Sequence, residues 1–260
     1  MIRHYDRTMT TQTSIVWVAG LGLFLATLDT GIINIALPTL QTAWHTTAAI
    51  MAWAVPAYTV MLAGTVLLWG RLADRQGPQR IFWSGLIGFS VSSIACGAAP
   101  TLSLLITARA LQGLASAMIQ GTAIALATVD LPPTERRLAT GTLAMLQGRG
   151  PVLGPALGGV LLTWASWRVL FWMNLPLTLP LIILLRHHLA VRTASHPVES
   201  LGLVGNGGVL VTVSLGLLAL TATGTIRPGP PRGTGPLANQ AVFTKPAICS
   251  PTLMTTDGGF

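Results

Sequence analysis

The sequence predicts an all-α membrane protein, a polytopic bundle of helices. Of its 260 residues, 51% are hydrophobic and only 8% are charged, whereas an average soluble domain carries roughly 25% charged residues. The mean hydropathy is +0.65, and so few charges cannot cover the surface of a water-soluble protein of this size. The apolar runs are continuous rather than alternating, which excludes a β-barrel. They predict helices, because a lipid-exposed backbone must satisfy its own hydrogen bonds.

Seven apolar runs are each long enough to cross about 30 Å of hydrocarbon as a helix. The first run is longer than a signal-peptide core and lacks a small-residue cleavage site, so we expect an uncleaved span. Beyond the seventh run, residues 224–260 hold six glycines and six prolines, a share that predicts disorder. The runs are 15–37, 50–69, 81–99, 102–129, 138–164, 169–185 and 203–220.

These runs divide the chain into four predicted parts. A cytoplasmic N-terminus (1–14) precedes a bundle of six transmembrane helices (15–190). A cytoplasmic linker and the seventh span (191–222) follow, and a disordered tail rich in proline and glycine (223–260) ends the chain.

Arginines mark one side of the predicted membrane protein. The N-terminus and the connections after the second, fourth and sixth runs carry nine arginines, against one, Arg168, in the alternate loops. Positive charge collects on the cytoplasmic side, so we expect a cytoplasmic N-terminus in the inner membrane of the cell. The net charge of +8 thus reflects topology, and no nucleic-acid partner is expected, since no basic patch contains interleaved aromatic residues. The nine arginines are Arg3, Arg7, Arg71, Arg75, Arg80, Arg136, Arg137, Arg186 and Arg192.

Three ionisable side chains lie at the depth of the spans: Asp29, Arg109 and Arg149. Such groups are costly in a membrane and are candidate functional residues by default. Asp29 and Arg109 have opposite charges and lie roughly 10–12 Å below the outer boundary, at about 1.5 Å per residue. We expect either a protonation or cation-sensing site that faces a water-filled cavity, or a buried ion pair that only fixes helix packing. Arg149 either lines the cavity or is a tolerated defect.

Two sets of polar side chains recur at helical spacing. A polar stripe that faces lipid is costly, so we expect both sets to face protein or water, as in a substrate pathway. The sets are Gln112, Ser116 and Gln120 after Arg109, and Thr27, Thr30 and Asn34 in the first run.

Several motifs resemble those of the major facilitator superfamily, in particular its fourteen-helix drug:proton antiporter branch. Residues 70–80, GRLADRQGPQR, are similar to the signature between helices two and three, and 28–38 to the first-helix motif. Arg109 to Gly113 resembles the R-x-x-Q-G motif of helix four. Residues 166–171 with Asn174 and Pro176 resemble the entry to helix six. The helix-five motif, G-x-x-x-G-P-x-x-G-G, is matched by Gly150, Gly154, Pro155, Gly158 and Gly159.

The resemblance implies a fold and roles for these residues. It implies the N-terminal six-helix half of a major facilitator fold plus one extra span, with the second half missing. The loop Gly70, Asp74, Arg75, Gly77 and Arg80 would be a conformational latch, and the glycines of helix five an antiporter motif. The proton-coupling and substrate-cavity residues would be Asp29, Asn34, Arg109 and Gln112.

The implied function is proton-coupled multidrug efflux rather than an enzymatic activity. We expect no cofactor, with a proton gradient as the energy source, no metal site and no catalytic residues. The expected partners are membrane lipid, small amphipathic or cationic substrates and a second half-transporter chain. One alternative is a transport-inactive polypeptide truncated by a frameshift near Gly224, where the composition changes. Another is a half-transporter completed by a separate chain or by self-association.

The arginine asymmetry makes a topology prediction. Gln76 and Glu135 should face the cytoplasm, and Thr42 and Pro100 should face outside. Single cysteines at these four positions, in a chain that lacks its two native cysteines, can be treated with an impermeant thiol reagent in intact cells. We expect labelling only at positions 42 and 100; labelling only at 76 and 135 would reverse the topology.

Overall fold

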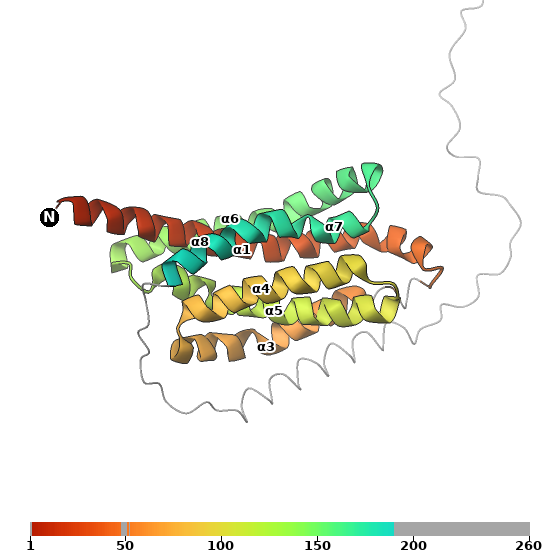
Figure 1. Cartoon of the computed structure of the whole chain (residues 1–260), viewed down its shortest axis with the longest axis horizontal. Helices are drawn as coiled ribbons and strands as arrows, with labels where there is room; N and C mark the ends of the chain where they lie inside the picture. The colour runs from red at the N-terminus through yellow and green to blue at the C-terminus, as the bar shows by residue number, and fades with distance from the viewer. Residues whose placement is uncertain (1, 48–50, 52, 190–260) are drawn as a thin grey trace, which may run out of the picture.

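The computed structural model describes residues 2–47, 51 and 53–189. The linker with the predicted seventh span, the tail and the composition change near Gly224 lie outside the described residues. Within the described ranges the chain is helical, without strands, and the long helices run side by side (Figure 1). The helices are α1 (Ile2–Ala43), α3 (Ala54–Gln76), α4 (Pro78–Ala98), α5 (Leu102–Thr128), α6 (Pro133–Trp164), α7 (Arg168–Trp172) and α8 (Asn174–Leu189).

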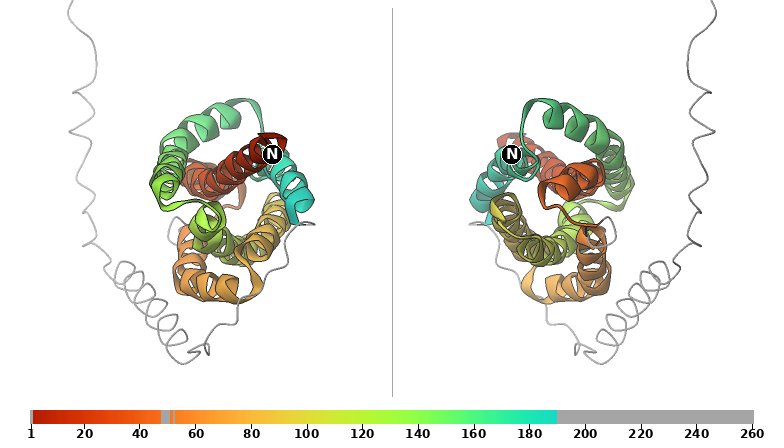
Figure 2. Two further views of the ribbon diagram at one scale, coloured as in Figure 1. Left: turned by 90° about the vertical axis from the view of Figure 1, so that its left-hand side faces the viewer. Right: turned by 90° about the vertical axis from the view of Figure 1, so that its right-hand side faces the viewer.

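Seen from either end, the helices pack around one another in one bundle (Figure 2). α1 packs chiefly on α6 and also touches α5 and α8, while α5 packs between α3 and α4. The short connections from α3 to α4 and from α4 to α5 make these helices antiparallel neighbours. The predicted all-α polytopic bundle is therefore confirmed.

Five helical segments of the described chain are long and apolar enough to cross a membrane. They are Thr13–Ala43, Ala54–Gln76, Pro78–Ala98, Leu102–Thr128 and Arg168–Arg186. The predicted span 138–164 is helical within α6, which has 32 residues. It is not among the five, because Arg149, Gln147 and several glycines and prolines lower its hydropathy.

The predicted sixth span is divided into α7 and α8 at Met173. Pro176 explains the interruption, since a proline has no N–H for the carbonyl four residues earlier, at Trp172, and its ring crowds that carbonyl. Asn174, the first residue of α8, is fully buried there. The break therefore places a polar side chain inside the bundle.

The predicted latch loop is mostly helical, which corrects the expectation of a loop over residues 70–80. Gly70, Asp74 and Arg75 lie in the last turns of α3, and Arg80 lies in the first turn of α4. Gly77 alone separates the two helices, with φ of +91°. Glycine adopts positive φ without a Cβ penalty, and the proline that follows it begins a helix readily. Glycine and proline thus reduce the turn to one residue.

Two apolar clusters form the core, one toward each end of the bundle. The first holds Leu25 of α1, Phe89 of α4 and Ile119 of α5. The second holds Ile33 of α1 and Leu105 of α5, together with residues of α7. Buried polar side chains lie between them, at the level of Asp29. The core therefore consists of a polar layer enclosed by two apolar layers.

Glycines of the predicted helix-five motif bring α6 against the backbone of α1. A Cβ on Gly150 would lie 2.7 Å from the Leu28 amide nitrogen, and one on Gly154 would lie 2.8 Å from Gly31 Cα. Gly158 also faces α1, at 3.5 Å from Ile32 Cα, whereas a Cβ on Gly159 would have nothing within 4 Å. Small residues allow such close helix packing in membranes.

Thr27 supports α6 where a proline interrupts its hydrogen bonds. Pro151 cannot donate to the carbonyl of Gln147, four residues earlier. The Thr27 hydroxyl lies 3.0 Å from that carbonyl oxygen and can donate to it across the helix interface. The glycines of α6 therefore pack on the backbone of α1, and Thr27 of α1 contacts the carbonyl that Pro151 leaves without its helical donor.

We predict that Gly150→Ala and Gly154→Ala destabilise the bundle, whereas Gly159→Ala does not. The first two methyl groups would overlap α1, and overpacking typically costs about 1–3 kcal/mol; the third would meet open space. Unfolding of the purified chain by denaturant in lipid micelles measures the difference. Equal stability of the three variants would contradict the close packing of α1 and α6.

Candidate functional site: a buried acid and arginine

An ion pair between two helices forms the centre of the polar layer. Arg109 Nη1 of α5 lies 2.5 Å from Asp29 Oδ2 of α1, and the side chains are 0% and 3% exposed. Removing two charges from water is expensive, and their attraction repays the cost only when further hydrogen bonds satisfy both groups. The surroundings supply such bonds to the Asp29 carboxylate and to Arg109 Nη1, whereas Arg109 Nε and Nη2 are buried without a hydrogen-bond partner in the described part of the chain.

The two oxygens of the Asp29 carboxylate have different partners. Oδ2 accepts from Arg109. Oδ1 accepts from Gln112 Nε2 at 3.2 Å and from Asn174 Nδ2 at 3.0 Å. Side chains from α5 and α8 therefore hold one carboxylate of α1 from two sides.

Ser93 of α4 joins the two amides. Its hydroxyl oxygen accepts from Gln112 Nε2 and from Asn174 Nδ2, each at 3.0 Å. Gln112 Oε1 in turn accepts from Arg109 Nη1 at 2.8 Å. Arginine only donates, so the Gln112 oxygen must face it and the nitrogen must face Asp29. The orientation of this amide is thus determined by its neighbours.

Tyr58 of α3 covers the guanidinium group. Arg109 Cζ lies 4.5 Å from the centroid of the Tyr58 ring, a cation–π geometry that is stronger in a desolvated site. The Tyr58 hydroxyl lies 2.6 Å from Ser116 Oγ and 3.0 Å from the Ala26 carbonyl oxygen. A Cβ at Gly113 would lie 2.2 Å from the Tyr58 carbonyl oxygen. Gly113 of the R-x-x-Q-G segment therefore lets α3 approach closely enough to cover Arg109.

The structure gathers some predicted site residues and separates others. Asp29, Arg109, Gln112 and Ser116 lie together, all buried. Asn34 is exposed on α1. The predicted stripes therefore do not line one open cavity. Thr27 contacts carbonyls of its own helix and of α6, Thr30 contacts the Ala26 carbonyl and the Tyr58 side chain, and Gln120 reaches Ser116 in the described contacts.

Three residues of the polar layer were not predicted as site residues: Ser93, Tyr58 and Asn174. Asn174 belongs to the segment that resembles the helix-six entry, and that segment was the signal available for it. Ser93 and Tyr58 stand in apolar runs where serine and tyrosine have many packing roles. Their part in the site depends on which helices are neighbours.

The other predicted residues lie away from the pair. Asp74 is exposed at the end of α3, and Arg149 is exposed on α6. Helical distance at about 1.5 Å per residue places Gly77 about 24 Å along α4 from Ser93. The latch residues and the ion pair are thus separate features of the bundle.

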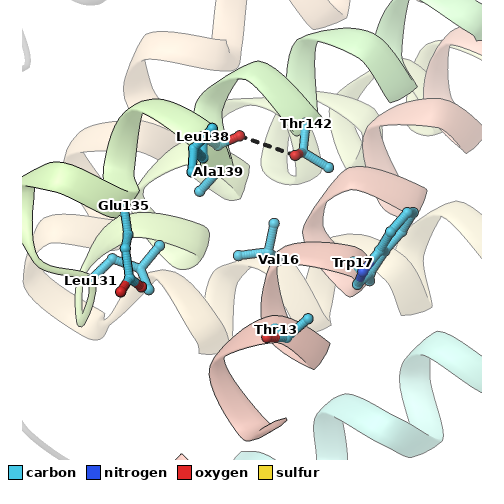
Figure 3. Close-up of a pocket in the computed structure, with 8 residues that line it drawn as sticks. All are labelled: Thr13, Val16, Trp17, Leu131, Glu135, Leu138, Ala139 and Thr142. Carbon is cyan, nitrogen blue, oxygen red and sulfur yellow. Dashed lines mark hydrogen bonds between the residues drawn. The ribbon is translucent and has the colours of Figure 1, made fainter. Parts of the chain in front are cut away.

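A cavity of about 410 Å³ lies between α1 and α6 at the end of the bundle near the N-terminus (Figure 3). One carboxylate, Glu135, is the ionisable group in its lining. Trp17, the lining residue nearest Asp29 in sequence, is about 18 Å from it along α1 at 1.5 Å per residue. The cavity is therefore distinct from the polar layer. It is lined by Thr13, Val16, Trp17, Leu131, Glu135, Leu138, Ala139 and Thr142.

Comparison with protein families matches residues 19–254 to the Major Facilitator Superfamily. The chain belongs to the major facilitator superfamily. The match covers most of the chain and extends past residue 224, where the composition changes.

Known relatives of this major facilitator chain bear the names of multidrug resistance proteins. It is 37% identical over 162 residues to the putative multidrug resistance protein MdtD of Serratia proteamaculans, covering 62% of this chain and 34% of that protein. It is 36% identical over 168 residues to the multidrug resistance protein Stp of Mycobacterium tuberculosis, covering 64% and 31%. Against MdtD of Escherichia coli O9:H4 it is 32% identical over 224 residues, covering 82% and 47%. The chain thus spans less than half of these relatives.

We predict that Asp29 and Arg109 are energetically coupled. Asp29→Asn or Arg109→Gln alone leaves one charge buried without its counter-charge, a loss of about 3–5 kcal/mol. The double variant should lose less than the sum, as contacting residues do. Unfolding free energies of the four proteins in lipid micelles give the coupling, and strict additivity would contradict a direct interaction.

Proposed function

We propose that this chain supplies the N-terminal half of a proton-coupled multidrug exporter in the inner membrane, with its N-terminus in the cytoplasm. The ion pair of Asp29 and Arg109, enclosed between two apolar layers, is the observation that carries the proposal. An ionisable pair at membrane depth is expensive to keep, and such groups in membrane helices serve ion pathways. The names of the multidrug resistance relatives support drugs as substrates.

Proton binding to Asp29 would change the energy of the whole polar layer. A neutral acid no longer balances the Arg109 charge, which is 0% exposed and beyond the reach of water in this arrangement. An uncompensated buried charge favours any conformation that hydrates it or gives it another partner. Opening of the bundle interface on protonation would thus couple the proton to substrate movement.

A second half would complete the pathway. Transporters of this general kind alternate access by rocking two repeats about a site between them. In this proposal Asn34, exposed on α1, and Gln112, beside the pair, contribute to the cavity. Small amphipathic or cationic molecules would be the substrates in this proposal. Asp74 and Arg75 would latch the cytoplasmic side against the partner half, and the α6 glycines would permit α6 to move along α1.

The function can be tested in a chimera that joins residues 1–222 to the C-terminal half of an MdtD relative. In a pump-deficient strain we expect dye efflux that a protonophore abolishes and that Asp29→Asn and Arg109→Gln each reduce to background. Thr178→Val, a buried substitution that spares the ion pair, is the matched control and should retain efflux.

Membrane levels of each variant must be equal for the comparison. Efflux that survives Asp29→Asn would contradict proton coupling at this site. Energy-dependent efflux by the 260-residue chain expressed alone would contradict the need for a second half.

A further inference from the structure

Asn174 holds the one unused acceptor among the amides of the described polar layer, where Arg109 Nε and Nη2 are unused donors. The side chain is fully buried. Its nitrogen donates to Asp29 Oδ1 and to Ser93 Oγ, each at 3.0 Å. Its oxygen, Oδ1, is buried without a hydrogen-bond partner in the described part of the chain. Most buried polar atoms have a partner, so such an acceptor needs an explanation.

The two forms of Asp29 need opposite partners. An ionised carboxylate only accepts hydrogen bonds, whereas a protonated acid also donates one. Arg109 donates to Oδ2 and cannot accept, so an acid proton there would oppose the existing contact. The proton therefore belongs on the Oδ1 side, where two amide nitrogens now point at the carboxylate.

Of the two amides, only Asn174 is free to turn. The Gln112 oxygen is engaged by Arg109 at 2.8 Å, so rotation of that amide would set two donors against each other. Rotation of Asn174 would give up both donations of its nitrogen, to Asp29 and to Ser93, and would present the unused oxygen to the acid proton. Ser93 would keep its bond from Gln112.

We propose that Asn174 is a positioning residue for the Asp29 carboxyl group: its amide nitrogen holds the ionised form, and its unused oxygen accepts the proton of the neutral form. This inference rests on the proposed function of Asp29 as the proton carrier. It connects the protonation of α1 with α8, since rotation of the amide changes the contact between α8 and α4. The proton is taken from the aqueous side and returned to it, and no other bond is made or broken.

Infrared difference spectroscopy can detect this contact in the full chain in lipid nanodiscs. The carbonyl stretch of the protonated Asp29 is identified in acid-minus-neutral spectra by its loss in Asp29→Asn. We expect Asn174→Leu to shift this band to higher frequency, because the acid loses an acceptor. Asn174→Gln, which restores an amide, should move it back toward the wild-type position.

Thr178→Val is the matched control for helix packing, because the Thr178 hydroxyl contacts Ser90 and the main-chain carbonyl of Asn174 but not the Asn174 amide side chain. Thr178 and Ser90 form the neighbouring bond between α8 and α4, 2.8 Å long, one turn from Asn174. Its removal should leave the Asp29 band unchanged. A band that is unmoved in Asn174→Leu, that moves as far in Thr178→Val, or that never appears would overturn the proposal.

A second measurement needs no change at Asn174. The chain has four asparagines, Asn34, Asn174, Asn206 and Asn239, so amide signals of selectively labelled protein can be assigned. The Asn174 signal should shift with pH in the wild type and remain constant in Asp29→Asn; a constant wild-type signal would contradict the proposal. Efflux by the chimera is measured separately: a band shift without efflux refutes only the proposed function, and efflux without a band shift refutes only the role of Asn174.

Discussion

The contact between Asp29 and Arg109 is the constraint to which the rest of the bundle is adapted. Two charges that are almost fully buried need every available hydrogen bond, because neither water nor lipid supplies one. Gln112 of α5 and Asn174 of α8 bond to the pair, Tyr58 of α3 covers the guanidinium, and Ser93 of α4 accepts from both amides. A shift of α5 or α8 would remove a bond from the buried carboxylate, and a shift of α3 or α4 would remove a group that covers the pair or orients its amides, so the pair makes the helix positions interdependent.

The apolar layers on both sides strengthen the electrostatic attraction within the pair and raise the free-energy penalty of leaving either charge unpaired. Aliphatic and aromatic side chains above and below exclude water from the polar layer, and electrostatic interactions grow as the dielectric constant falls. The same exclusion makes an unpaired charge expensive. In the proposed function, protonation of Asp29 would favour a second arrangement in which the layer is open to water.

α6 differs from the helices around the pair, because glycines, which have no side chain, form much of its contact with α1. Gly150 and Gly154 bring the two backbones together, and Thr27 compensates for the hydrogen bond that Pro151 removes from Gln147. Leucine side chains of α6 add to this contact: Leu143 lies in the first apolar cluster, and a Cβ at Gly20 would lie 2.4 Å from Leu146 Cδ1.

The sequence by itself determined the class of the protein and the depth of its charged groups. Hydropathy predicted the spans, because the thickness of the bilayer sets the length of a span. The arginine distribution predicted their orientation, because positive charge prefers the cytoplasmic side. The match in depth and charge of Asp29 and Arg109 also followed from position along the chain. Only the tertiary structure decided that Ser93, Tyr58 and Asn174 complete the site, that Asn34 lies outside it, and that residues 70–80 turn at Gly77 alone. Periodicity orders residues around one helix, whereas a site at the junction of several helices depends on which helices are neighbours and how they are rotated. Those contacts join residues up to 145 positions apart, and no local pattern encodes them.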